Sequence, residues 1–125
     1  MSKLLWEPSE ERIQNTNMYR FMTLVNEKFN QDFTEYTALY QWSLDNIEDF
    51  WCTAWDFLDI KAFKPFDKTL ENLAKMLGTR FFVNSTLNFA QNLLLFRNNK
   101  TALIFRGEDS IRRTLSYTEL YDQVR

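Results

Sequence analysis

The sequence predicts a mainly α-helical chain with a small β-hairpin near its C-terminal end, which is an α+β fold class. Three observations support this prediction. Apolar residues recur at intervals of three and four through much of the first half, which is typical of amphipathic helices. Aromatic residues make up 17% of the chain, which indicates a buried core and not a disordered segment. Two β-rich stretches, 101–106 and 112–117, then flank a short polar turn.

The first half is predicted to contain several helices. A short turn of helix is expected after Ser9, which is a good N-cap, and a longer helix follows over residues 17–29 because its apolar residues share one face. The next helix runs toward Leu44, and either Asp32 or Thr34 is expected to cap it.

A break at residues 43–46 precedes the helix with the clearest apolar pattern. Asp45 and Glu48 have the spacing of a capping box. The pattern places Thr53 on the solvent side and predicts one buried face. That face consists of Ile47, Phe50, Trp51, Ala54, Trp55 and Leu58. Truncating either of its tryptophans to alanine is expected to cost about 3–5 kcal/mol if the site is buried.

The second half begins where Pro65 ends the helical block, because proline disfavours helical backbone at the residue before it. Residues 67–77 are ambiguous, and their apolar spacing is compatible with one short helix. A short extended segment is expected at Arg80–Val83. Residues 84–86 are then expected to cap a helix over residues 87–96.

The last part of the chain is predicted to be a hairpin that leads into a helix. Residues 107–110 form the expected turn, and Ser116 with Glu119 has the pattern of a capping box. The helix that follows has Leu120 and Val124 on its apolar side. A lone two-stranded ribbon is marginal in water, so we expect this hairpin and helix to open a larger α/β domain.

Composition excludes several functional classes. The chain has two glycines, far below the usual ~7%, so it can build neither a P-loop nor a dinucleotide-binding loop. It has no histidine, which rules out histidine-based catalysis and imidazole zinc sites. Cys52 has no histidine partner and is expected to be an inert thiol. We therefore expect no catalytic, cofactor-binding or metal-binding residue in this chain.

Charge and hydropathy argue against two kinds of partner. The net charge is −2 and no long basic run is present, so no nucleic-acid partner is expected. The longest apolar runs, 93–96 and 102–105, are far shorter than the ~20 residues that span a bilayer, so no membrane partner is expected. Residues 1–7 contain no apolar stretch of the signal-peptide type. Together with the single cysteine, this favours a cytoplasmic location.

A series of short motifs resembles the N-terminal region of acetoacetyl-CoA synthetases. These are acetoacetate–CoA ligases of the adenylate-forming superfamily, and they are related to acetyl-CoA synthetase. The motifs are WEPS at 6–9, NMYRF at 17–21, WSLD at 42–45, FW at 50–51, RFF at 80–82, LNFAQNLL at 87–94 and TLSYTEL at 114–120. They follow one another in order through nearly the whole chain.

The resemblance implies both an organisation and a role. Residues 1–97 would be the helical N-terminal segment, and residues 98–125 would begin the α/β AMP-binding domain. Ligases of this family use ATP and Mg²⁺ to adenylate a carboxylate, and the coenzyme A thiol then displaces AMP. Their catalytic motifs lie downstream of this region, so the resemblance implies a structural portion that is inactive by itself.

The sequence departs from the family at two positions. The family usually has a glycine-containing turn after the aromatic pair, whereas residues 83–86 of this chain are Val-Asn-Ser-Thr and contain no glycine. Asn84 tolerates left-handed backbone better than most residues, so we expect the turn to survive. Gln91 stands where the family usually has an acidic residue.

Several apolar residues of the second half are a candidate docking surface. They are Phe81, Phe82, Leu87, Leu94 and Phe96. Exposure, internal packing and burial in an oligomer are all open for them. The expected partner is the remainder of the ligase chain, or a second copy through uncovered apolar surface. The alternative function is a free-standing helical protein-interaction module derived from a truncated paralogue.

Overall fold

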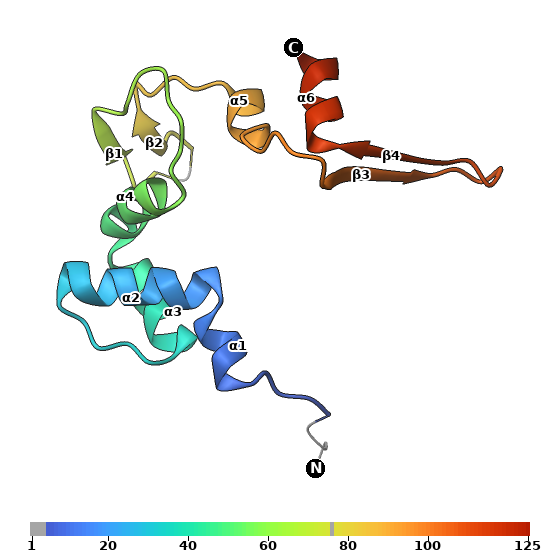
Figure 1. The fold of residues 1–125 in the computed structure, drawn as a ribbon. Helices are drawn as coiled ribbons and strands as arrows, with labels where there is room; N and C mark the ends of the chain where they lie inside the picture. The colour runs from blue at the N-terminus through green and yellow to red at the C-terminus, as the bar shows by residue number, and fades with distance from the viewer. Residues whose placement is uncertain (1–4, 76) are drawn as a thin grey trace. The chain divides into compact units, whose positions relative to one another are not determined.

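The structure is a computed structural model that describes residues 5–75 and 77–125 (Figure 1). Residues 1–4, where no signal sequence is expected, and Met76, within the ambiguous segment, lie outside the described residues. The elements are α1 (Glu10–Gln14), α2 (Asn17–Phe29), α3 (Tyr36–Asp45), α4 (Ile47–Phe57), β1 (Lys68–Glu71), β2 (Arg80–Val83), α5 (Phe89–Leu93), β3 (Thr101–Arg106), β4 (Arg112–Ser116) and α6 (Tyr117–Val124). The α+β fold class is confirmed.

The chain divides into two compact units. The first unit is Met1–Asp59 with Thr69–Phe81, and the second is Ile60–Lys68 with Phe82–Arg125. Each unit is compact in space. The boundary expected at residue 97, where a larger domain would begin, stays a prediction.

The core of the first unit lies among α2, α3 and α4. Its buried side chains are Phe21, Met22, Val25, Leu39, Trp42 and Ala54. The Trp42 ring lies 5.0 Å from Phe29 and 6.3 Å from Phe33, measured between centroids. Large rings in such tilted contacts supply much of the apolar burial that stabilises a small core.

The first two helices begin and end as predicted. The Ser9 hydroxyl caps α1 by accepting a hydrogen bond from the Arg12 backbone N–H at 3.3 Å. Thr16 caps α2 in the same way, accepting from the Tyr19 N–H at 3.1 Å. The chain therefore starts a second helix after α1, with a cap of its own.

The predicted caps of the next two helices are wrong. Glu35 is the N-cap of α3, in place of Asp32 or Thr34, and its side chain makes no capping bond. Asn46 occupies the N-cap position of α4 without a side-chain capping bond, and the capping box expected from Asp45 does not form. Asp45 is instead the last residue of α3, where its carboxylate accepts hydrogen bonds from Gln41 at 3.1 and 3.2 Å.

The buried face of α4 is rotated relative to the prediction. Thr53, expected to face solvent, is 1% exposed, and its hydroxyl accepts a hydrogen bond from the Lys28 ammonium at 3.1 Å. Trp51 and Leu58, expected to be buried, are exposed, with 40% of Trp51 accessible. The helix packs through Ala54 on its neighbours. The small Thr53 side chain allows this close approach, whereas an indole at that position would not.

The ambiguous segment 67–77 contains a strand, so the interpretation of this segment as a short helix is wrong. β1 pairs with β2 in a two-stranded sheet. Thr69 and Leu70 of β1 are buried, and Arg80 forms an ion pair with Glu71 at 3.3 Å across the sheet. Helix and strand cannot be told apart by periodicity in a run this short.

In the second unit, α5 is shorter than predicted and starts later. Its N-cap is Asn88, whose side-chain oxygen accepts from the Gln91 N–H at 3.1 Å. Residues 84–86 are therefore not its cap. They bond to the segment around Lys64, where the backbones of Lys64 and Thr86 form an antiparallel bridge.

The predicted hairpin and final helix are confirmed. β3 and β4 pair antiparallel, with Ile104 opposite Thr114 and Arg106 opposite Arg112. The capping box of α6 is complete, since Ser116 and Glu119 bond reciprocally. The hydrogen bonds from the Ser116 backbone and hydroxyl lower the pKa of the Glu119 carboxyl, because they favour its charged form.

Left-handed backbone occurs at several residues with side chains. They are Asn30, Asp59, Asn72, Phe82, Asn84 and Ser110, with φ between 49° and 64°. Most are asparagine or aspartate, whose short polar side chains tolerate this conformation best.

Candidate docking surfaces

An open apolar groove of about 510 Å³ lies among α2, α3 and α4 in the first unit. Its rim includes Met18, Tyr36, Tyr40, Trp51 and Leu58, all of them exposed. The rings of Tyr36 and Tyr40 stack with centroids 6.1 Å apart. None of the residues that line this groove carries a formal charge, so the groove is suited to packing and not to acid–base chemistry.

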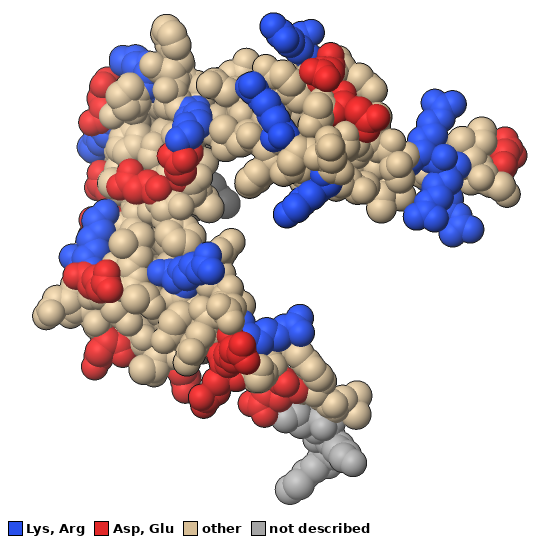
Figure 2. All heavy atoms as spheres, viewed as in Figure 1, with Lys and Arg blue, Asp and Glu red and all other residues tan. Residues whose placement is uncertain are grey.

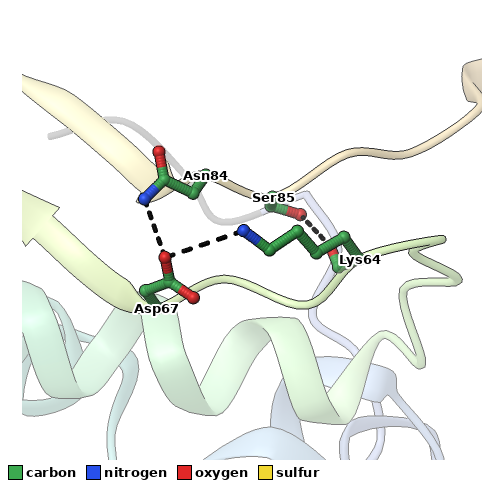
Figure 3. Close-up of polar contacts among 4 residues, drawn as sticks. All are labelled: Lys64, Asp67, Asn84 and Ser85. Atoms are coloured by element: carbon green, nitrogen blue, oxygen red, sulfur yellow. Dashed lines mark hydrogen bonds and ion pairs between the residues drawn. The ribbon is translucent and has the colours of Figure 1, made fainter.

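A corner in the second unit joins two chain segments that are far apart in sequence (Figure 3). The Asp67 carboxylate accepts a hydrogen bond from the Asn84 amide at 2.7 Å and lies 3.8 Å from the Lys64 ammonium. The Ser85 hydroxyl donates to the Lys64 carbonyl at 3.1 Å. These contacts hold the turn after β2 against the segment that follows α4.

A further set of hydrogen bonds, here called the Asn92 clamp, joins α5 to the segment that follows α4. The Asn92 side chain accepts from the Lys61 N–H at 2.8 Å and donates to the Lys61 carbonyl at 2.8 Å. It also donates to the Asn88 carbonyl at 3.0 Å. One side-chain amide therefore pairs with both the N–H and the C=O of Lys61, as the backbone of a neighbouring strand would.

The expected docking residues do not form one described surface. Phe81 belongs to the first unit, and Phe82, Leu87, Leu94 and Phe96 belong to the second. Phe81, Leu87 and Phe96 are exposed, with 64% of Phe96 accessible, and Phe82 is half-buried. Leu94 is 7% exposed. Leu94 therefore packs in the interior, which is one of the arrangements left open for these residues.

The residues of this chain do not fit the cofactors of an adenylate-forming ligase. Among residues 5–75 and 77–125, no three Asp, Glu or Cys side chains gather closely enough to hold a metal ion. Gly78 and Gly107, the two glycines of the chain, lie far apart in sequence and cannot form a phosphate-binding loop. The described helices include none that is long and apolar enough to cross a membrane.

Comparisons with known proteins agree on one family. A family model described as "Acetyl-coenzyme A synthetase N-terminus" matches residues 36–93. The acetoacetyl-coenzyme A synthetase of Rhizobium meliloti (strain 1021) is 35% identical over 116 residues, which cover 93% of this chain and 18% of that protein. The acetoacetyl-CoA synthetase of Danio rerio is 31% identical over 118 residues, covering 94% of this chain and 17% of that protein.

A solved structure gives the decisive observation. The acetoacetyl-CoA synthetase from Streptomyces lividans matches with a TM-score of 0.84 and 28% identity, covering 98% of this chain and 20% of that one. This chain corresponds to the N-terminal portion of acetoacetyl-CoA synthetases. It spans about 18% of the length of the curated synthetase from R. meliloti.

The turn after β2, where a glycine-containing turn was expected for the family, has a backbone conformation that favours glycine. Asn84 has φ 63°, in the left-handed region, as expected from its tolerance of that conformation. Asn84 therefore adopts the backbone conformation that this turn requires. The Asn84 side chain adds the bond to Asp67 that glycine cannot make.

Replacing Asn84 separates these two effects. We expect Asn84→Ala to destabilise the protein by about 1–2 kcal/mol, because alanine is strained in left-handed backbone and loses the bond to Asp67. Asn84→Gly loses only the bond and should cost less. Urea unfolding followed by circular dichroism measures both changes. Equal losses in the two variants would contradict a role for backbone strain.

Sequence reasoning missed two features of this synthetase portion. The four-residue spacing of Tyr36 and Tyr40 signalled a shared helical face, but not that the face stays open as a groove. The Asn92 clamp gave no signal, because its partner Lys61 lies 31 residues away in sequence.

Proposed function

We propose that this chain serves as the structural N-terminal portion of an acetoacetyl-CoA synthetase-like ligase. The observation that carries the proposal is the likeness to the S. lividans synthetase, which extends over 98% of this chain at a TM-score of 0.84. No group of three Asp, Glu or Cys side chains that could hold a metal ion occurs among residues 5–75 and 77–125, which supports a contribution through a folded surface.

The two segments on either side of the boundary at residue 97 have different structural roles in this proposal. Residues 1–97 provide helices that pack on the large domain, and residues 98–125 supply the hairpin and helix with which the AMP-binding domain begins. The exposed residues Phe81, Leu87 and Phe96, with half-buried Phe82, are the proposed contacts to the remainder of the ligase. Burying such side chains would stabilise the assembled enzyme by about 1.5–3 kcal/mol for each one that becomes fully covered.

The proposed reaction of the full ligase is the ATP- and Mg²⁺-dependent adenylation of acetoacetate, followed by thioester formation with coenzyme A. This assigns the protein to lipid metabolism in the cytoplasm. The residues that bind ATP, Mg²⁺ and coenzyme A would all come from the remainder of the ligase.

An exchange assay tests the proposal directly. The 125-residue chain alone should give ATP–pyrophosphate exchange with acetoacetate no higher than background. A synthetase that lacks its corresponding first segment should regain exchange when this chain is added. Turnover by the chain alone would overturn the structural role, and failure of the two pieces to combine would overturn the proposed packing.

A matched pair of variants localises the contact. We expect Phe96→Glu to weaken the combination of the two pieces, because a buried unpaired carboxylate is costly. The nearby exposed Asn99→Glu should leave it unchanged. Equal effects of the two substitutions would remove Phe96 from the contact.

A further inference from the structure

The groove among α2, α3 and α4 leaves large apolar side chains uncovered within one unit. Its rim includes the exposed residues Met18, Tyr40 and Leu58, and its floor includes the buried residues Phe21 and Leu39. Its volume of about 510 Å³ lies within the range of about 300–1,000 Å³ that is typical of binding pockets. Apolar side chains exposed together in this way mark a surface that another segment covers.

The lining of the groove offers few hydrogen-bond partners to an occupant. Besides the two tyrosine hydroxyls, its polar side chains are Asn17 and Ser43, and the Ser43 hydroxyl already donates to the Tyr40 carbonyl at 2.7 Å. The walls are helices, whose backbone groups are bonded internally. An extended segment would bury unpaired N–H and C=O groups here, whereas a helix satisfies its own. The occupant that fits is therefore a helix with one apolar face.

The unit that carries the groove is strongly acidic, and Figure 2 shows many acidic side chains over its helices. By sequence the first unit has 12 acidic and 6 basic residues, a net charge of −6, whereas the second has 5 and 9, a net charge of +4. A field of one sign attracts a partner of the opposite sign and repels one of the same sign. The helix that fills the groove is therefore expected to be basic beside its apolar face.

Acidic residues also adjoin the groove directly. Arg20 is the one basic residue that stands next to a lining residue in the sequence. Four acidic residues do so, namely Glu35, Asp49, Asp56 and Asp59. Asp56 lies 4.0 Å from the Lys28 ammonium, whereas Glu35 and Asp49 are exposed beside Tyr36 and Phe50. The local charge thus has the same sign as the charge of the whole unit.

A second copy of this chain offers no suitable helix among residues 5–75 and 77–125. The helices that do not line the groove are α1, α5 and α6. α1 and α6 carry more acidic than basic residues, and α5 carries no charge. The remainder of a synthetase is the larger source, because the match to the R. meliloti protein covers 18% of its length.

We propose that an amphipathic helix from the remainder of the ligase, with basic residues beside its apolar face, fills this groove. The inference rests on the proposed function and adds the place at which the first unit is held and the chemistry of its partner. The exposed rings of Tyr40 and Trp51 would be its main anchors, since buried aromatic side chains supply much of the binding energy of an interface. Glu35 and Asp49 would orient the basic flanks.

A matched pair of leucines tests the groove. Leu58 lines it and is 61% exposed, whereas Leu44 of the same unit is 48% exposed and does not line it. This chain is titrated with a synthetase that lacks the corresponding segment. Leu58→Glu should raise the dissociation constant about tenfold or more, because it buries an unpaired carboxylate. Leu44→Glu should leave it within about twofold. Circular dichroism of each variant checks that the fold is kept.

The outcomes separate this inference from the function on which it rests. If the two pieces combine but the two leucine substitutions have equal effects, the groove assignment is overturned and the structural role stands. If the wild-type pieces do not combine, both are overturned. Sedimentation of the chain alone covers the remaining occupant. A dimer that Leu58→Glu abolishes would assign the groove to a second copy and overturn the inference.

Charge reversal tests the chemistry of the occupant. Glu35→Lys combined with Asp49→Lys should raise the dissociation constant about five- to tenfold. Glu10→Lys combined with Glu11→Lys changes two exposed acidic residues of α1 in the same unit and should leave it within about twofold. Raising the ionic strength to about 1 M, where the Debye length is about 3 Å, should weaken the wild-type combination. Equal effects of the two reversals, or no loss of affinity with salt, would contradict a basic helix and overturn the proposal.

Discussion

Replacing Trp42 with alanine is expected to cost about 3–5 kcal/mol of folding free energy. Trp42 is 8% exposed and its ring contacts those of Phe29 and Phe33. Truncation leaves a cavity that the short helices around it can fill only partly. Since small domains are stable by about 5–15 kcal/mol, this one change would remove a large share of the total. Chemical denaturation followed by helical circular dichroism measures it.

Trp51→Ala is the matched control for that prediction. Both residues are tryptophans in the same helical unit, but 40% of Trp51 is accessible at the groove. We expect it to cost about half as much as Trp42→Ala, because less apolar area returns to water. An equal or larger loss at Trp51 would mean that the buried face of α4 is the one predicted from the sequence.

Replacing Asn92 with alanine is expected to cost about 2–3 kcal/mol. The side chain makes two bonds of 2.8 Å to the backbone of Lys61, one as acceptor and one as donor. Alanine removes both, and the partly buried peptide groups lose these partners. Loss of protection of the Lys61 amide from hydrogen exchange is the direct readout.

Two variants control for the Asn92 effect. Gln91→Ala changes the preceding exposed residue and should shift stability by no more than about 0.5 kcal/mol. Asn92→Asp keeps the acceptor for the Lys61 N–H but loses the donor, so we expect an intermediate cost. Protection of the Lys61 amide that survives in Asn92→Ala would contradict the clamp.

Elements with long, regular patterns could be predicted from the sequence. α2 has apolar residues on one face over its full length, and its bounds match the prediction. The hairpin and the capping box of α6 were predictable because they depend on neighbours in sequence. In these cases local propensity and tertiary structure favour the same conformation.

The errors occur where distant contacts outweigh local pattern. Nothing local shows that Thr53 packs inward against α2 while Trp51 is exposed, because the apolar spacing of α4 favours burial of the face that carries Trp51. β1 forms because β2 pairs with it, although its own spacing is compatible with a helix. Likewise the turn at Asn84 is held by Asp67 and is not free to cap α5. The burial of Leu94 likewise could not be read from its local pattern.

The left-handed turns built without glycine also affect the unfolded chain. Asn30, Asn72 and Asn84 occupy positions where glycine would fit with less strain. A residue with a side chain explores fewer backbone states when unfolded, so folding gives up less entropy at each of these turns. Part of the local strain of the native turns is thereby offset before folding begins. The denatured ensemble is narrower than it would be with glycine at the same places, and its turns are already partly restricted.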